Sequence, residues 1–378
     1  VLLRHISSLG ELWLDEIWTL RLLRQIDSVY GIFIGINHDN NHFLNSLYIY
    51  TIGSQDASQI RYKAVIFGSL SVVAAFIATP GTLFAKMVAG ILFAISFMMV
   101  QYGSEARGYA GFVLATIISI WAIDRIINHQ KGRFILAAAI LLGFLSHLIM
   151  IATVANLVIW HSWSVWQRTR KFRSVNEEVG WAFGPAFVAV LPLALCMLVG
   201  RTLYGFSFGG ISAFTVDAFV FGYAEMVRHL LGIGSGLSDW TIVVLVLIGT
   251  PVLIAISQTQ RGSLYIGGIV AIPLLMAAFN VPNLEFPRYF LLQGVLILLL
   301  LAEAIGRLLE RAAYRWIGLI VVCVFVFTNI SKFIEFRESR RGNYADIVET
   351  IMSSGETEYA SNHALQSGFV VEHLAQGK

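Results

Sequence analysis

Ten apolar segments follow one another between residues 64 and 330, and most are close to the roughly 20 residues that a helix needs to cross a bilayer. The fourth and fifth segments are short and meet near Ser146 and His147. These two could form one kinked hairpin or two helices that do not fully cross. The pattern predicts an all-α polytopic membrane protein with about ten transmembrane helices. The segments are residues 64–79, 82–100, 110–127, 134–147, 149–163, 180–200, 240–257, 263–280, 289–305 and 314–330.

The composition agrees with this fold class. The chain has 378 residues, of which 57% are hydrophobic and 13% are charged, whereas soluble domains are about 45–50% apolar and about 25% charged. Its two cysteines, Cys196 and Cys323, lie in apolar runs and indicate neither a disulfide framework nor a metal-binding motif. There is no Walker loop, HExxH or GxSxG motif. The basic residues are spread among many loops, so nothing in the sequence supports nucleic-acid binding.

The basic residues of the short loops indicate the orientation in the membrane. If residues 1–60 are outside, the only basic residues of the short outer loops near residues 101–109 and 281–288 are Arg107 and Arg288. Cytoplasmic loops carry an excess of lysine and arginine. We therefore expect both ends of the chain on the extracytoplasmic, or periplasmic, face of the plasma (inner) membrane. The basic residues then placed inside are Lys86, Arg125, Lys131, Arg133, Arg168, Arg170, Lys171, Arg173, Arg261, Arg307 and Arg311, with Arg315 just beyond.

Three regions follow from this topology. Residues 1–63 are expected to form a first extracytoplasmic loop that contains the active site. Residues 64–330 form the transmembrane helical domain, with a second outer loop at residues 201–239. Residues 331–378 form a short extracytoplasmic C-terminal segment, which we expect to be truncated, and an upstream helix could be missing from the start of the chain.

Several outer segments have local structure signals. Ser8 and Glu11 fit a capping box ahead of an apolar stripe. We expect an interfacial amphipathic helix there, lying on the membrane. Residues 213–231 read as another amphipathic helix, residues 343–352 as a helix, and residues 358–361 as the start of a strand. The apolar stripe consists of Leu9, Trp13, Ile17, Leu20 and Leu23.

The first loop contains acidic residues and histidines among aromatic and aliphatic side chains. Acidic groups beside a bilayer are costly unless they face water, a partner or a ligand, so we expect the chemistry here. Asp15 and Glu16 are adjacent, and side chains of neighbouring helical residues point about 100° apart. One of the two could accept a proton from a hydroxyl. The alternative is a solvated acidic first turn that the helix dipole favours.

A second acidic group in this loop is Asp39, with His38 and His42 close by in the sequence. A carboxylate and two imidazoles within five positions could hold a divalent cation. The alternative is an Asn/Asp-rich turn whose side chains bond to their own backbone.

Two arginines stand where predicted helices reach the outer face. Glu105 and Arg107 precede one helix, and Arg288 opens another. An arginine there can bind a phosphate through charge-assisted hydrogen bonds. The alternative is an ion pair that closes a helix end. For His147, inside an apolar run, a hydrogen bond between helices is favoured over a ligand role.

Four patches of the sequence occur in the order found in one enzyme family. Together they resemble the GT-C glycosyltransferases that use polyprenyl-phosphate sugars, in particular the bacterial branch similar to protein O-mannosyltransferases and lipid A aminoarabinose transferases. The family's two prolines after the histidine of the second patch are Phe43 and Leu44 here. The patches are residues 14–16 (LDE), 39–48 (DNNHFLNSLY), 104–110 (SEARGYA) and 287–290 (PRYF).

The resemblance implies an integral-membrane inverting glycosyltransferase of GT-C-like fold. It would move a sugar from a polyprenyl-phosphate donor to a hydroxyl of a lipid, glycan or protein on the extracytoplasmic face. Asp15 would be the general base, with Glu16 beside it, and Arg107 and Arg288 would bind the donor phosphate. Asp39 and His42 would form an acceptor or metal site, where any divalent cation would be held with His38. The supporting residues would be Glu105, Tyr109 and Tyr289.

Two other classes of protein remain open from the sequence. A lipid or solute transporter would place polar residues near the middle of the bilayer, whereas most charges here lie at the predicted helix ends. A non-catalytic GT-C-like subunit of a membrane complex would keep the fold without the chemistry, since a fold does not determine activity.

Overall fold

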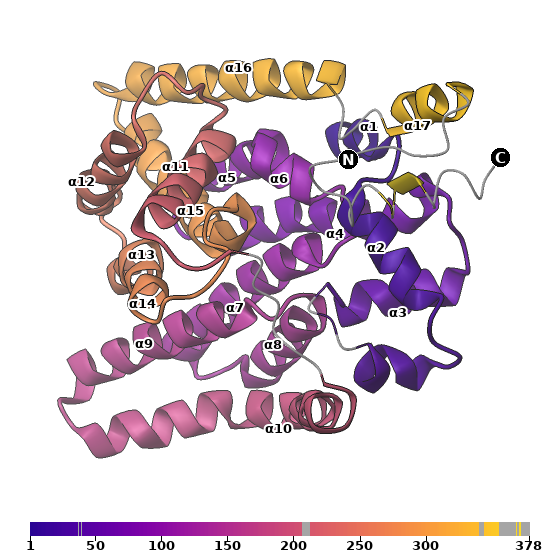
Figure 1. Cartoon of the computed structure of the whole chain (residues 1–378). Coiled ribbons are helices and arrows are strands. Elements are labelled where there is room, and N and C mark those ends of the chain that lie inside the picture. The colour runs from indigo at the N-terminus through magenta and orange to yellow at the C-terminus, as the bar shows by residue number, and fades with distance from the viewer. Residues whose placement is uncertain are drawn as a thin grey trace.

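The structure is a computed structural model that describes residues 1–36, 38, 40–205, 212–339, 344–354, 368 and 370–371. Asp39 and the strand predicted at residues 358–361 therefore lie outside the described residues. Helices make up most of the described chain (Figure 1).

Over its described residues, the first half of the chain contains eleven helical elements. They are α1 (Leu2–Ser8), α2 (Leu14–Leu23), the π-helical turn η1 (Gly31–Gly35), α3 (Phe43–Ile52), α4 (Ala57–Ala78), α5 (Leu83–Ile95), α6 (Phe97–Tyr102), α7 (Tyr109–His129), α8 (Arg133–Ser146), α9 (Met150–Thr169) and α10 (Phe172–Tyr204).

The second half, over its described residues, continues the helical pattern. Its elements are α11 (Val216–Leu231), α12 (Asp239–Ser257), α13 (Gly262–Ile266), the π-helical turn η2 (Gly267–Ala271), α14 (Ile272–Ala278), the 3₁₀ turn η3 (Pro287–Phe290), α15 (Leu291–Glu310), α16 (Arg315–Ser339) and α17 (Tyr344–Ser353). The helices predicted at residues 213–231 and 343–352 are confirmed as α11 and α17.

Six helices in the described part of the chain are long and apolar enough to cross a membrane. They are α4, α7, α10, α12, α16 and the continuous η3–α15 segment. The all-helical membrane fold is thus supported. All ten predicted segments fall on helices, but α5, α8 and the α13–α14 segment are shorter apolar helices, and α9 does not meet the same criteria. The count of ten crossings stays a prediction.

Burial separates the inner helices from the outer ones. The most apolar windows of η3–α15 and α7 are 89% and 72% buried, whereas those of α10 and α12 are 17% and 11% buried. Most residues of α15 are leucine, isoleucine or valine. Figure 1 shows α10 and α16 at opposite edges of the molecule, with α7 between them. The exposed apolar faces of the outer helices are therefore the surfaces that lipid would cover.

The N-terminal helices lie together at one end of the long helices, at the right of Figure 1. The predicted capping box of Ser8 and Glu11 is wrong. Ser8 is the last residue of α1, and its hydroxyl donates to the carbonyl of His5 at 2.7 Å. The next helix begins only at Leu14, because Glu16 accepts the backbone N–H of Trp13 at 3.2 Å. The expected amphipathic helix therefore begins later than predicted: residues 9–13 are irregular, and only the part of the apolar stripe in Leu14–Leu23 is helical.

Candidate functional site

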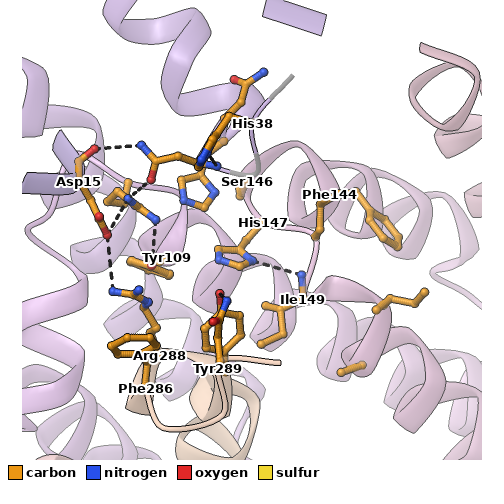
Figure 2. A pocket seen from close by; sticks show the side chains of 18 of the residues that line it. Asp15, His38, Tyr109, Phe144, Ser146, His147, Ile149, Phe286, Arg288 and Tyr289 are labelled. Carbon is orange, nitrogen blue, oxygen red and sulfur yellow. Dashed lines mark hydrogen bonds and ion pairs between the residues drawn. The ribbon is translucent and has the colours of Figure 1, made fainter. Parts of the chain in front are cut away.

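A cavity of about 360 Å³ opens where the N-terminal segment meets the ends of several long helices. Its polar side contains Asp15, Arg107 and Arg288, which were predicted from three separate parts of the sequence. Figure 2 shows Asp15 and Arg288 at this side of the cavity. Its other side is apolar. The residues of the apolar side include Phe144, Leu148, Ile149, Ile151, Ala152, Met276, Val281, Pro282 and Phe286.

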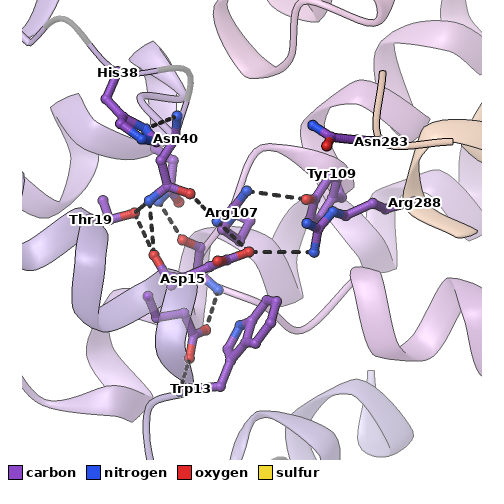
Figure 3. Close-up of polar contacts among 12 residues, drawn as sticks. Trp13, Asp15, Thr19, His38, Asn40, Arg107, Tyr109, Asn283 and Arg288 are labelled. Carbon is purple, nitrogen blue, oxygen red and sulfur yellow. Dashed lines mark hydrogen bonds and ion pairs between the residues drawn. The ribbon is translucent and has the colours of Figure 1, made fainter. Parts of the chain in front are cut away.

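Asp15 sits in the first turn of α2 and faces two guanidinium groups. Its Oδ2 lies 2.9 Å from Nη1 of Arg107 and 3.5 Å from Nη1 of Arg288 (Figure 3). The side chains of Asp15 and Arg107 are 14% and 6% exposed, and that of Arg288 is 20% exposed. The carboxylate is therefore largely buried but still borders the cavity.

Neighbouring polar groups fix the orientation of this cluster. Asn40 donates from its amide nitrogen to the carbonyl of Asp15 at 3.1 Å and to the hydroxyl of Thr19 at 3.0 Å. Its amide oxygen accepts a hydrogen bond from Arg107. Arg107 also donates to the hydroxyl of Tyr109 at 3.2 Å. Side chains held by several hydrogen bonds at once are preorganised, which is what a binding site requires.

Arg107 keeps its positive charge in this environment. Burial acts to lower the pKa of its guanidinium, but the neighbouring Tyr109 and Asp15 outweigh that effect, so the pKa is raised. Arg288, at the other side of Asp15, packs its guanidinium over the ring of Phe286 at 4.3 Å. Tyr289 also borders the cavity, and its hydroxyl accepts a hydrogen bond from Asn283 at 3.4 Å.

The structure separates Glu16 from Asp15. Glu16 is fully buried, does not line the cavity, and forms an ion pair with Arg61 of α4, which is also fully buried. Arg61 donates from Nε to Oε1 of Glu16 at 2.9 Å, and the backbone N–H of Ala106 donates to the same oxygen at 2.7 Å. With Trp13 as a further donor, this carboxylate is occupied by protein groups on all sides.

The turn before α7 carries Arg107 and packs tightly against the end of α8. A Cβ added to Gly108 would lie 1.7 Å from the carbonyl oxygen of Ser146, so only glycine fits there. The carbonyl of Ala106 in the same turn accepts a hydrogen bond from Asn45 at 2.5 Å. Glu105 is buried in this turn, 3% exposed, and does not line the cavity.

Two histidines meet inside the cavity. The ring of His42 lies 4.7 Å from that of His147, and the ring of Tyr109 lies 5.7 Å from the first and 5.2 Å from the second, centre to centre. His147 was not predicted as a site residue. The available signal was a polar residue at the meeting point of two short apolar segments, which is where α8 ends and α9 has not yet begun.

The predicted metal site cannot be assembled from the described residues. Asp39 lies outside them, while His38 and His42 both line the cavity. Within the described ranges, no group of three or more histidine, cysteine, aspartate or glutamate side chains could hold a metal ion. A divalent cation therefore stays a prediction that depends on Asp39.

Comparison with protein-family models, with curated proteins and with solved structures finds no match for the chain. The chemistry of the cavity must then be read from its own groups. Its described residues offer one carboxylate that borders the open space, two arginines directed at that carboxylate, three imidazoles and an apolar wall. Such a site suits a ligand with an anionic group and an apolar part.

Proposed function

We propose that the chain is an inverting glycosyltransferase of the membrane, which transfers a sugar from a polyprenyl-phosphate donor to a hydroxyl on the extracytoplasmic face. The acceptor would be a lipid, a glycan or a protein. The observation that carries the proposal is the Asp15 carboxylate, held between Arg107 and Arg288 at the border of a cavity with an apolar wall. The resemblance of the four sequence patches to the GT-C glycosyltransferases supports the same assignment.

The two arginines suit the phosphate of such a donor. Guanidinium groups bind phosphate oxygens with paired, charge-assisted hydrogen bonds. In the structure both groups contact the same oxygen of Asp15. An incoming phosphate would compete with that carboxylate for the arginines. Donor binding and release of Asp15 are therefore coupled in this mechanism.

Release from the arginines leaves the carboxylate of Asp15 free to contact the acceptor hydroxyl, as a general base must. Asp15 then takes the proton of the acceptor hydroxyl. The hydroxyl oxygen attacks the anomeric carbon, a new C–O bond forms, and the bond from that carbon to the phosphate oxygen breaks. The electron pair leaves with the polyprenyl phosphate, whose charge Arg107 and Arg288 stabilise. A single displacement inverts the anomeric configuration.

The apolar wall suits the lipid part of the donor. The segment between α8 and α9 contributes Leu148 and Ile149 to the cavity, and α9 contributes Ile151, whose side chain is 67% exposed on the outer surface. The polar cluster lies at the start of α7 and of η3–α15, which are candidate membrane spans. A prenyl chain could therefore run from the cavity into surrounding lipid while its phosphate stays at the arginines.

One feature favours the alternative of a non-catalytic GT-C-like subunit. Paired charges also occur in purely structural ion-pair networks, and Asp15 is paired with both arginines in the structure. A transporter has less support, because the charged residues of the cavity lie at helix ends and not along a central path. An activity measurement separates these functions.

The test is a transfer assay with purified protein and a labelled polyprenyl-phosphate sugar, comparing wild type with Asp15→Asn. General bases contribute about 10²–10⁴-fold to rate, so we expect at least about a 100-fold loss. Asp27→Asn is the matched control, because Asp27 belongs to the same N-terminal region, is exposed and does not line the cavity.

Transfer that persists in Asp15→Asn would refute the assignment of Asp15 as the base. Absence of transfer by the wild type, together with binding of the donor, would favour the non-catalytic subunit. If the wild type neither transfers the sugar nor binds the donor, both the proposed function and the non-catalytic GT-C-like alternative are contradicted.

A further inference from the structure

A second cavity, of about 340 Å³, lies at the other end of the most buried helices. Its lining comes from the ends of α7 and α15 and from the loops before α5 and α13. The first residue of α7, Tyr109, lines the cavity that contains Asp15, and Asp124 of the same helix lines the second cavity. These two positions are about 22 Å apart along a helix. Because the hydrocarbon core of a bilayer is about 30 Å thick, the second cavity lies near the opposite face of the membrane.

Arg261, directly before α13, holds the walls of the second cavity together. It is 3% exposed and forms ion pairs with Asp124 of α7 and Glu303 of α15. It also donates to the carbonyl of Ala78, the last residue of α4, at 2.6 Å. Tyr265 donates to the same oxygen of Glu303. Three helices are thus fixed around this loop, so the cavity is preformed, as binding sites for small ligands usually are.

Two charged side chains of the lining remain accessible to a ligand. The side chain of Asp124 is 23% exposed, and only its Oδ2 contacts Arg261, so Oδ1 has no partner among the described residues. Arg307 of α15 has a side chain that is 40% exposed. It forms an ion pair with Glu310 at 3.1 Å and donates to the amide oxygen of Gln258 at 2.7 Å, and its Nε has no partner among the described residues. The cavity therefore presents one carboxylate oxygen and one guanidinium group.

The chemistry of the lining restricts the class of ligand. Among the described lining residues, the acidic side chains of Asp124, Glu303 and Glu310 outnumber the basic ones of Arg261 and Arg307 by one. A ligand with several negative charges is therefore repelled. None of the described lining residues is aromatic, whereas quaternary ammonium groups are recognised by aromatic cages. A primary ammonium group has N–H donors that suit carboxylate, hydroxyl and amide oxygens, and a single phosphate beside it matches one arginine.

Apolar side chains continue the surface beside the second cavity. Thr82 and Ala85 line the cavity at the start of α5, and Leu83, Phe84 and Met87 of the same helix are exposed. An exposed apolar face on a membrane protein is a surface that lipid covers. A molecule whose polar group occupies the cavity can therefore place acyl chains on α5. This combination favours a lipid headgroup over a soluble compound.

We propose that the second cavity binds the headgroup of a phospholipid with a primary ammonium group, such as phosphatidylethanolamine, from the leaflet opposite to the Asp15 cavity. The ammonium group donates to Asp124, the phosphate accepts from Arg307, and the acyl chains lie against α5. Arg261 and Glu303 hold the walls in place and do not contact the lipid. The site is separate from the proposed glycosyltransferase chemistry, so each proposal can be refuted without the other.

The experiment measures binding of single lipids to the purified protein in detergent by native mass spectrometry. The probes are phosphatidylethanolamine, phosphatidylcholine and phosphatidylglycerol with the same acyl chains, and glycerophosphoethanolamine, which has the first headgroup without acyl chains. We expect phosphatidylethanolamine to bind about tenfold more tightly than the other two lipids, the size of effect of one charge-assisted hydrogen bond. Glycerophosphoethanolamine should bind at least about tenfold more weakly than the whole lipid, because it buries no acyl chain.

Two variants assign the two contacts. Asp124→Asn keeps an acceptor for Arg261 but removes the charge, so it should reduce the preference for phosphatidylethanolamine over phosphatidylcholine to about twofold or less. Arg307→Gln should weaken both lipids to the same extent and keep the preference, because both lipids carry the phosphate. Arg168→Gln is the control, since Arg168 forms an exposed ion pair with Glu178 at the same end of the long helices but outside the second cavity. Thermal unfolding of each variant verifies that it is folded.

Several outcomes would overturn the lipid site. Equal binding of phosphatidylethanolamine and phosphatidylcholine by the wild type, or an unchanged preference in Asp124→Asn, would show that no ammonium group is recognised there. Tightest binding of phosphatidylglycerol would replace the proposal by an anionic lipid. Glycerophosphoethanolamine that binds as tightly as the whole lipid would make the cavity a site for a soluble compound. The comparison of lipids in the wild type and in Arg307→Gln tests the proposal even if Asp124→Asn does not fold.

Discussion

Asp15 and Glu16 are chemically similar neighbours with different environments. Asp15 borders the cavity and contacts two arginines that also line it, whereas Glu16 is fully enclosed by Arg61 and two backbone N–H groups. The sequence does not distinguish the two carboxylates, because the partner that encloses Glu16 comes from α4. The choice between a reactive and a structural carboxylate is thus made by tertiary contacts.

His42 leads to a prediction about pH and stability. The pKa of His42 in the folded protein is well below its usual value because of burial first and Arg107 second, while the unfolded chain has a pKa of about 6.5. Below about pH 6.5 the unfolded chain therefore binds a proton that the folded protein does not, and stability falls as pH falls. Above that pH this residue has no effect on the pH dependence.

The measurement is the melting temperature in detergent between pH 5 and pH 8. The contribution of one such proton is at most about 1.4 kcal/mol for each pH unit below about 6.5. We expect His42→Gln to weaken the decline on the acid side. His129→Gln, a change at an exposed histidine, should keep the wild-type profile. An unchanged profile in His42→Gln would contradict a buried, neutral His42.

At the scale of elements, Arg61 holds the N-terminal segment against the body of the protein. From its place in α4 it donates to the carbonyls of Ser8, Gly10 and Glu11 at 2.7–3.0 Å and to the carboxylate of Glu16. Glu16 in turn accepts from the turn that carries Arg107. One ion pair thus sets how α2 lies relative to that turn, and hence where Asp15 stands.

This arrangement predicts unequal effects of single and double substitutions. Arg61→Met leaves a buried carboxylate without its partner, and breaking a buried ion pair in this way costs about 3–5 kcal/mol. The double variant Arg61→Met with Glu16→Leu leaves no unpaired charge, so it should unfold at a higher temperature than Arg61→Met alone. Melting temperatures in detergent would show this non-additivity.

The control is the ion pair of Arg173 and Glu177, which is 90% and 63% exposed. Arg173→Met should have little measurable effect, because exposed ion pairs contribute little. If the double variant is less stable than Arg61→Met by the full effect of Glu16→Leu, the two residues do not act as a pair.

At the scale of the whole molecule, the apolar runs predicted where helices occur but not where they break. The predicted segment 82–100 is interrupted at Ser96, because its hydroxyl donates to the carbonyl of Leu230 and Asn329 accepts the N–H of Phe97. These partners are more than 130 positions away, so no local pattern contains them. The cavity is likewise lined by residues from separate parts of the chain, so no local pattern predicts it.

For the site, the sequence predicted that Asp15, Arg107 and Arg288 face the same side of the membrane. The structure places Nη1 of Arg107 2.9 Å and Nη1 of Arg288 3.5 Å from Oδ2 of Asp15. The charges of the loops and the resemblance to the GT-C glycosyltransferases were sufficient for that prediction. The sequence indicated that two segments meet at His147 but not that this residue enters the cavity, because its ring contacts come from His42 and Tyr109, which are distant in the sequence.

Orientation in the membrane is the remaining prediction, and it follows from the distribution of arginine and lysine among the loops. In a background where Cys196 and Cys323 are replaced by alanine, single cysteines are introduced as Ser28→Cys, Ser353→Cys and Lys131→Cys. All three positions are exposed in the structure. With both chain ends outside, a membrane-impermeant maleimide should label the first two in spheroplasts and the third only after permeabilisation. Labelling of Lys131→Cys from outside would invert the topology and move the Asp15 cavity to the cytoplasmic face. Labelling of only one of the two end positions would require an odd number of crossings, which is incompatible with the predicted ten.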